Sequence, residues 1–293
     1  MSLAVMAGAG EITVRDDRGE QTLPGTPQRV VALNWSLTGD LLELGITPVG
    51  VADIEGYNQW VVNPPLPERV ADVGTRAEPN IERIAALEPD LILLSTDQKG
   101  LAGTMERVAP VLWFDAFRRD HDNVEKAREI FLTLGRVFDR ESMAREKLAR
   151  QQQRFEKLSG KLREHFGQDL PEVAVVLIGG PTTVRLYGEN SLPQHALKRL
   201  GLEPAMPQPP SQWGQNKKPV SDLSAIDEGI LLYLKPTRLA GDLFTTPLWQ
   251  ALPVVEQDRV AAVEATWPYG GVLSLRYLAE HMTEALLTID PDA

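Results

Sequence analysis

A long segment without proline divides this chain into two parts. Between Asn123 and about Glu164 the sequence is rich in Ala, Glu, Lys, Arg, Gln and Leu, residues that favour helices. Gly135 and Asp139 are its only plausible interruptions, so it forms one helix or two in tandem. Forty helical residues rise ~60 Å, more than one small domain needs. We therefore expect residues 121–168 to form one long helix that joins two lobes.

On both sides of this segment, short apolar runs alternate with amphipathic runs. Before it, strands are expected at residues 29–33, 48–52, 90–95 and 111–115. After it, strands are expected at residues 173–178, 183–188, 230–235 and 259–264, with residues 203–219 as a proline-rich loop. Helices fill most of the gaps. The alternation predicts an α/β fold in which each lobe has a central, mostly parallel sheet flanked by helices.

The predicted domain boundaries follow from this pattern. The runs ITV and QTL flank RDDRGE near the start of the chain and predict a hairpin. We expect an N-terminal segment at residues 1–27, an α/β lobe at residues 28–120, the connecting helix, and a second α/β lobe at residues 169–293.

The composition limits the class of protein. The chain is 43% hydrophobic and 24% charged, with no apolar run near the ~18 residues that span a membrane, which is typical of a soluble globular protein. Its formal net charge of −11 argues against nucleic acid as a partner, because that binding needs clustered basic side chains. The absence of cysteine excludes disulfides, zinc–thiolate sites and thiol nucleophiles.

The first ten residues, MSLAVMAGAG, are not an intact signal peptide, because they lack a basic region and have few apolar residues. The AGA at residues 7–9 has the small-x-small form of a cleavage site. A periplasmic protein without its complete signal and a protein with a cytosolic N-terminus both remain open on this evidence.

The sequence contains none of the common catalytic or metal-binding motifs, such as a nucleophile elbow, a Walker A loop or a zinc-protease signature. Its four histidines are far apart, so we expect no metal site: His121, His165, His195 and His281. A hydrolase with loop carboxylates is an alternative, and its candidate acids are Asp97, Asp115 and Asp242. Binding is the better explanation of this sequence.

Tryptophans and one arginine are the best candidates for a binding site. Trp113 and Trp249 fall inside predicted elements and are expected in the core, whereas the other aromatic candidates lie in or beside loops: Trp35, Trp60, Trp213, Trp267 and Tyr269. Together they favour a shared aromatic cleft. Arg76, in a loop before a helix, is either half of a surface ion pair or a cation that binds ligand oxygens. The residues alone do not decide between the two.

With its segments in this order, the chain resembles the periplasmic proteins that bind iron(III)-hydroxamate siderophores, such as ferrichrome, for ABC importers. The resemblance runs from Arg29 to the last helix and rests on these segments: RVVALNW, LGITPVGVAD, YNQWVVNPPLP, DVGTRAEPN, YGENSLPQHAL, TTPLWQALP and WPYGGVLS. It implies two lobes with a shallow cleft, no catalysis and no cofactor. It also implies that the siderophore alone coordinates the iron.

The resemblance also assigns roles to individual residues. Arg76 matches the family arginine that reaches hydroxamate oxygens, and the cleft aromatics match Trp60, Trp213, Trp267 and Tyr269. Where the family has a tyrosine after the strand DLILLS, this chain has Gln98, so Gln98 or Lys99 is expected to donate instead. Ser211 and Gln215 are expected to add polar contacts that suit a linear or differently substituted hydroxamate.

The expected partners are a ferric hydroxamate siderophore and an inner-membrane ABC permease, with the chain as a periplasmic monomer. Related proteins dock to the permease through one acidic residue on each lobe, and the matching residues are Glu82 and, with a different spacing, Asp222. A receptor of the same architecture for a catecholate siderophore, haem or a corrinoid remains the alternative.

Overall fold

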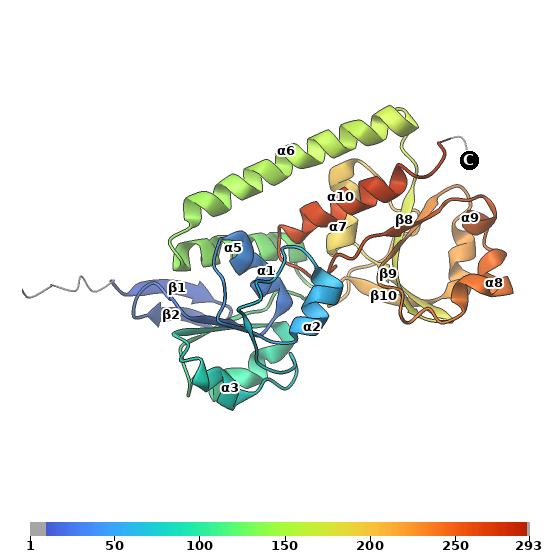
Figure 1. Ribbon diagram of the computed structural model, residues 1–293. Helices are drawn as coiled ribbons and strands as arrows, with labels where there is room; N and C mark the ends of the chain where they lie inside the picture. Colours follow the sequence, from blue (N-terminus) through green and yellow to red (C-terminus); the bar gives the residue numbers. More distant parts are fainter. Residues whose placement is uncertain (1–9, 292–293) are drawn as a thin grey trace, which may run out of the picture. The chain divides into compact units, whose positions relative to one another are not determined.

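The computed structural model describes residues 10–291 and divides into two compact units (Figure 1). Unit 1 comprises the described residues up to Ile54, with Leu66–Ala116 and Glu129–Arg145. Unit 2 comprises Glu55–Pro65, Phe117–Arg128 and the described chain from Glu146 onward. The expected cleavage-site motif at residues 7–9 lies outside the described residues.

The sheet of unit 1 has five parallel strands in the order β5-β4-β3-β6-β7. Their bounds are β3 Val30–Ala32, β4 Gly50–Val51, β5 Ala71–Asp72, β6 Leu91–Ser95 and β7 Val111–Phe114. The helical elements of this part of the chain are α1 Trp35–Glu43, α2 Ile54–Gly56, the π-helix η1 Tyr57–Val61, α3 Ile81–Ala86, the 3-10 helix η2 Thr96–Leu101 and α4 Ala102–Met105. Apolar side chains of α3 and α4 pack with alternate residues of β3, β6 and β7 in one buried cluster.

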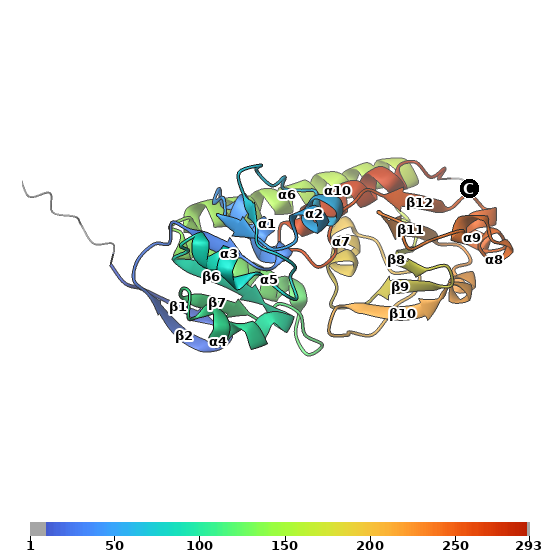
Figure 2. The same ribbon diagram turned by 60° about the horizontal axis from the view of Figure 1, so that its bottom comes forward.

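The sheet of unit 2 has five strands in the order β10-β9-β8-β11-β12 (Figure 2). Their bounds are β8 Val173–Gly180, β9 Thr183–Tyr187, β10 Gln215–Pro219, β11 Ile230–Leu234 and β12 Val260–Val263. The helical elements are α7 Leu192–Leu200, η3 Val220–Ala225, η4 Leu243–Thr245, α8 Pro247–Gln250, α9 Pro253–Glu256 and α10 Ser274–Leu286. Strands β8, β11 and β12 are parallel, whereas β9 and β10 are antiparallel to their neighbours.

These two sheets confirm the predicted fold class, and the strands expected from apolar runs are all present. Strand β10 was missed, because QNKKP carries one half-buried and one exposed lysine and lies in the region expected to be a proline-rich loop. Trp113 and Trp249 are buried in β7 and α8, as expected for core residues.

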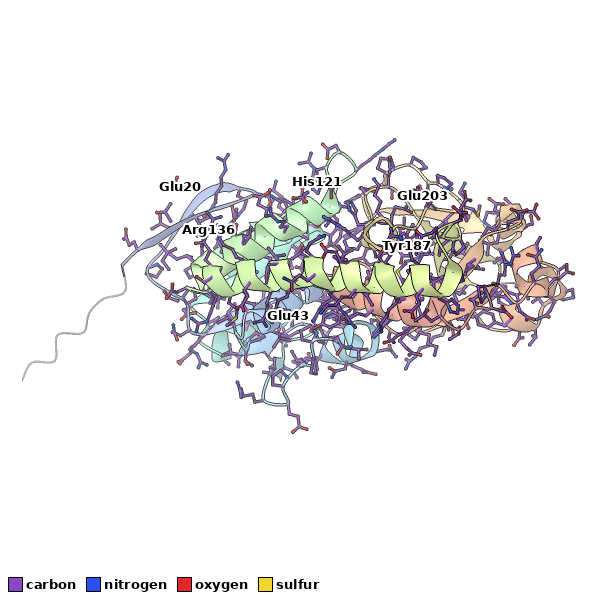
Figure 3. All side chains as sticks on the ribbon, turned by 90° about the horizontal axis from the view of Figure 1, so that it is seen from above. Glu20, Glu43, His121, Arg136, Tyr187 and Glu203 are labelled. Carbon is purple, nitrogen blue, oxygen red and sulfur yellow. The ribbon has the colours of Figure 1, made fainter. Side chains whose placement is uncertain are left out.

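The connecting segment is two helices in tandem, which was one of the two expected forms, and not one long helix over residues 121–168. Helix α5 spans Asn123–Val137 and α6 spans Glu141–Phe166, and Arg136 marks the end of α5 in Figure 3. Asp139 has a φ of 54° between them, a left-handed conformation that a helix cannot contain. A Cβ added at Gly135 would lie 3.1 Å from the Cβ of Ala144, so glycine lets the two helices approach closely at the break.

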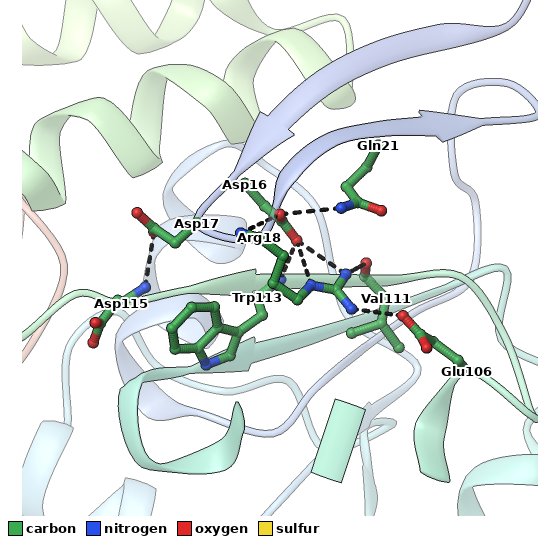
Figure 4. Close-up of polar contacts among 8 residues, drawn as sticks. All are labelled: Asp16, Asp17, Arg18, Gln21, Glu106, Val111, Trp113 and Asp115. Atoms are coloured by element: carbon green, nitrogen blue, oxygen red, sulfur yellow. Dashed lines mark hydrogen bonds and ion pairs between the residues drawn. The ribbon is translucent and has the colours of Figure 1, made fainter. Parts of the chain in front are cut away.

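The predicted hairpin forms, with β1 Ile12–Asp16 paired to β2 Gly19–Leu23. Figure 4 shows how it is attached to strand β7. The buried Asp16 carboxylate accepts hydrogen bonds from Arg18, from Gln21 and from the Trp113 backbone N–H, the last at 2.9 Å. The Asp17 N–H donates to the Trp113 carbonyl at 3.1 Å, so the hairpin covers the edge strand of the unit 1 sheet.

Among residues 10–291, no helix combines the length and the apolar character that a membrane span requires.

Candidate functional site

In unit 1, the loop between β5 and α3 presents Arg76 on top of Trp35. The guanidinium carbon of Arg76 lies 3.7 Å from the centroid of the Trp35 ring, a cation–π contact. Its Nε lies 3.6 Å from Oδ2 of Asp53, and its side chain is 36% exposed. Arg76 is therefore held by the Trp35 ring beneath it and by the Asp53 carboxylate beside its Nε, while solvent still reaches the rest of its side chain.

Burial lowers the pKa of Arg76, and the nearby carboxylates of Asp53 and Asp97 oppose that change. Because an arginine guanidinium stays protonated in proteins, Arg76 keeps its positive charge. It is a fixed hydrogen-bond donor suited to ligand oxygens with partial negative charge.

Trp35 was predicted to contact a ligand, and the structure shows it supporting Arg76. It is the first residue of α1, whose N-cap is Asn34, and it is only 3% exposed. Its indole N–H donates to the carbonyls of Ala52 and Asp53 at 3.1 Å each. The ring is therefore locked beneath Arg76 as part of the floor of this site.

Gln98 does not point to solvent, which corrects its predicted role as a direct ligand donor. It is buried, its Nε2 donates to the carbonyls of Leu33 and Arg76 at 2.7 and 2.9 Å, and its Oε1 accepts from the Ser95 N–H. Both of its amide N–H groups are thus used within the protein. Gln98 ties the backbone of Arg76 to the end of β3.

Lys99 is exposed, and its Nζ lies 4.8 Å from the centroid of the Trp113 ring. This cation–π contact holds the ammonium group over a core residue of β7. Whether Lys99 contacts a ligand stays a prediction.

In unit 2, the predicted loop aromatics form one cluster around Tyr269. Trp267 and Tyr269 have ring centroids 5.0 Å apart, Trp60 lies 6.0 Å from Trp267, and Trp213 lies 6.1 Å from Tyr269. All three contacts are edge-to-face, the favoured geometry for aromatic pairs. The three tryptophans are half-buried, so the cluster presents part of its indole surface to solvent.

Two further aromatics complete the cluster, and sequence reasoning missed both. Phe117 lies 5.4 Å from Trp213, and Tyr187 lies 6.3 Å from Tyr269. Tyr187 ends strand β9 and Phe117 follows β7, so neither stands in a loop rich in proline and glycine. Their position at or just beyond the end of a strand, as for Trp35, was the signal that could have found them.

The segment that carries Trp60 is held in place by polar contacts. With the Gln59 amide oriented so that its oxygen faces Arg238, the Arg238 Nε donates to it at 2.9 Å. Tyr57, fully buried, donates from its hydroxyl to the Pro64 carbonyl at 2.8 Å. The π-helix η1 thus presents Trp60 from a fixed backbone.

Ser211 and Gln215 lie beside Trp213, as expected, but differ in what they offer. The Ser211 hydroxyl donates to the Gln215 carbonyl at 2.7 Å, and its backbone is bound by the Asn190 amide. Ser211 therefore shapes the loop of Trp213. The side-chain oxygen of Gln215 is buried and accepts no hydrogen bond from the residues the structure describes.

The predicted docking acids are on helical elements of separate units. Glu82 is exposed in the first turn of α3, and Asp222 is half-buried in η3. The acids of the hydrolase alternative are spread similarly, with Asp97 and Asp115 in unit 1 and Asp242 in unit 2.

Across residues 10–291 no group of three or more side chains has the arrangement of a metal site. His195 lies 3.3 Å from Asp122, and burial lowers its pKa while Asp122 opposes the change. An imidazole beside one carboxylate is too few ligands for a stable metal centre.

Known proteins are similar to this chain in sequence and in fold. The family model described as "Periplasmic binding protein" matches residues 30–266. The iron(3+)-hydroxamate-binding protein FhuD of Escherichia coli is 31% identical over 262 residues, which cover 89% of this chain and 87% of that protein. The Fe(3+)-citrate-binding protein YfmC of Bacillus subtilis is 28% identical over 258 residues, covering 87% of this chain and 79% of that protein.

A solved structure gives a similar result. The siderophore-binding protein FhuD of Vibrio cholerae, bound to Fe3+-Desferal, is 44% identical with a TM-score of 0.87. The match covers 89% of this chain and 98% of that one. With the family model matched over most of its length, this chain belongs to the periplasmic binding protein family.

Proposed function

We propose that this protein is the substrate-binding component of an ABC importer and that it binds ferric hydroxamate siderophores. The observation that carries the proposal is the aromatic cluster of unit 2, in which three half-buried tryptophans surround Tyr269. The relatives named for hydroxamate or Desferal binding support the choice of ligand.

The chemistry of a ferric trihydroxamate suits the residues that the chain offers. Such a chelate is compact, its iron is already coordinated by hydroxamate oxygens, and its periphery is largely apolar. Indole surfaces bind that periphery, and the Arg76 guanidinium donates to oxygens that carry partial negative charge. Micromolar binding needs only about −8 kcal/mol, which a few aromatic contacts and two or three hydrogen bonds supply.

As a receptor of this kind, the protein performs no catalysis and uses no cofactor, and the siderophore alone binds the metal. It works as a monomer in the periplasm after export, and it delivers its ligand to the inner-membrane permease with Glu82 and Asp222 at the docking surface.

Ligand titration tests the proposal. Ferrichrome and ferrioxamine B should each quench the tryptophan fluorescence saturably, and Arg76→Ala should weaken binding about 10- to 100-fold, the value of one charge-assisted hydrogen bond. Arg83→Ala is the matched control, because Arg83 is an exposed arginine of the same unit on helix α3. A ligand at 100 times its Kd adds ~2.7 kcal/mol to the stability of the fold. If neither chelate at ~100 μM changes the fluorescence or the melting temperature, the hydroxamate assignment is wrong.

A further inference from the structure

Two basic side chains stand opposite each other on strands β9 and β10 of unit 2. Arg185 and Lys217 are directly paired in the antiparallel register, which places their Cβ atoms about 4.5–5.5 Å apart on one face of the sheet. Arg185 is half-buried and Lys217 is exposed, and neither forms an ion pair with another residue in the described part of the chain. Like charges in this position destabilise a sheet. Because the chain as a whole has a net charge of −11, this local pair of cations is a candidate binding site for an anionic group.

The same face carries two buried hydroxyl groups. Tyr187 lies two residues after Arg185 on β9, so both side chains project to the same side. Tyr187 is 3% exposed and Tyr269 packs against it, and within residues 10–291 neither hydroxyl has a hydrogen-bond partner of good geometry. Burial raises the pKa of both phenols, and the nearby Arg185 partly opposes this, so both hydroxyls stay protonated beneath the cation pair.

The groups that solvent reaches here only donate hydrogen bonds: the guanidinium of Arg185 and the ammonium of Lys217. A carboxylate is the complementary group, because it only accepts hydrogen bonds and takes two donors from a guanidinium. We propose that Arg185 and Lys217 form a subsite for a carboxylate on the ligand, with Tyr187 and Tyr269 buried beside it as its support. This inference rests on the proposed function, and it narrows the ligand to a hydroxamate siderophore with a carboxylate that is not bound to iron.

The position of the cation pair fits that ligand. Tyr187 pairs with Gln215 at the aromatic cluster, and Arg185 and Lys217 lie two residues farther along the same strands. Two residues of strand span about 7 Å. A chelate whose iron-binding core packs on the aromatic cluster can therefore reach the cations with a short arm.

Three ferric complexes of one trihydroxamate test the subsite. Desferrioxamine B is used with its terminal amine free, acetylated or succinylated, so the iron core is constant and the arm is cationic, neutral or a carboxylate. We expect the unmodified protein to bind the succinyl complex about 5- to 30-fold more tightly than the acetyl complex, between the values of an exposed ion pair and a charge-assisted hydrogen bond. The free amine should bind most weakly of the three.

Arg185→Gln and Lys217→Gln should each reduce the succinyl preference severalfold, whereas Lys218→Gln should keep it. Lys218 is the matched control, because it pairs with Val184 and projects from the opposite face of β10. Lys217→Gln should unfold at the same or a higher temperature than the unmodified protein, since it removes the repulsion between like charges at an exposed position.

Equal affinity of the unmodified protein for the succinyl and acetyl complexes would overturn the subsite, and so would an equal loss of preference in Lys218→Gln. Either result leaves the proposed function intact, since the complexes still bind. If none of the three complexes binds, it is the proposed function that fails.

Discussion

Arg76 and Trp35 form a stacked pair in which each residue is fixed by other parts of unit 1. The guanidinium carbon lies 3.7 Å above the indole centroid, the indole N–H is bound to the carbonyls of Ala52 and Asp53, and Gln98 donates to the Arg76 carbonyl. The cation is thus ordered before any ligand arrives. Less conformational entropy is then lost on binding, which favours affinity.

Gln98 should affect binding through Arg76. In Gln98→Ala the Leu33 and Arg76 carbonyls and the Ser95 N–H lose a buried partner, so we expect about 2–4 kcal/mol lower unfolding free energy and severalfold weaker binding of a ferric trihydroxamate. Urea unfolding and fluorescence titration measure the two effects.

A double-mutant cycle with Arg76→Ala separates positioning from general damage. If Gln98 acts by holding Arg76, then Gln98→Ala should reduce affinity little further in the Arg76→Ala background. If Gln98→Ala reduces the affinity by the same factor in both backgrounds, Gln98 does not act by holding Arg76.

Trp213 should contribute to binding much more than to stability. It is half-buried and contacts Phe117 and Tyr269 by its ring, so Trp213→Ala should raise the Kd for ferrioxamine B about 5- to 20-fold, with a small change in melting temperature. Trp249→Phe is the control, because Trp249 is buried in a separate cluster with Tyr233 and Phe244. The control should lower the melting temperature and leave the Kd unchanged. If Trp249→Phe raises the Kd and Trp213→Ala does not, the ligand binds elsewhere.

The hairpin should depend on Asp16. Its carboxylate is fully buried and accepts from Arg18, from Gln21 and from the Trp113 N–H, so Asp16→Ala should cost about 2–4 kcal/mol of unfolding free energy. Glu20→Gln, at an exposed position of β2, is the control and should change stability little. Chemical denaturation of both variants checks this, and a loss below ~0.5 kcal/mol in Asp16→Ala would mean that the network stabilises the fold little.

Asp40 should make stability fall as the pH rises. Burial raises its pKa well above 3.8, and the neighbouring Glu43 raises it further. Between the unfolded and the folded pKa, the folded state holds a proton that the unfolded state has released, so raising the pH through this window favours unfolding. Below the unfolded pKa both states are protonated and the penalty is absent.

Asp40→Asn should therefore flatten the pH dependence of stability. The amide is neutral at every pH, so the variant should gain urea stability over the unmodified protein at pH 8 and much less at pH 4. Asp139→Asn is the control, since Asp139 is exposed and its positive φ of 54° suits asparagine. An Asp40→Asn gain of the same size at both pH values would contradict a protonated Asp40.

Much of the fold could be predicted from the sequence, because apolar periodicity and caps act over a few residues. The strand LILLS and the helix LPQHALKRL, closed by Gly201, follow directly from those signals. Strand β10 could not be read in this way, because QNKKP acquires its strand conformation from pairing with β9 and not from its own propensity.

The candidate site, like the fold, depends partly on local sequence and partly on tertiary contacts. The sequence by itself determined which side chains have the chemistry to bind a chelate, namely Arg76 and the loop tryptophans. Only the tertiary structure decided that Trp35 lies under Arg76, that Gln98 is buried, and that Tyr187 joins Tyr269. These contacts join residues far apart in the chain, and packing of whole elements sets them, which no local pattern encodes.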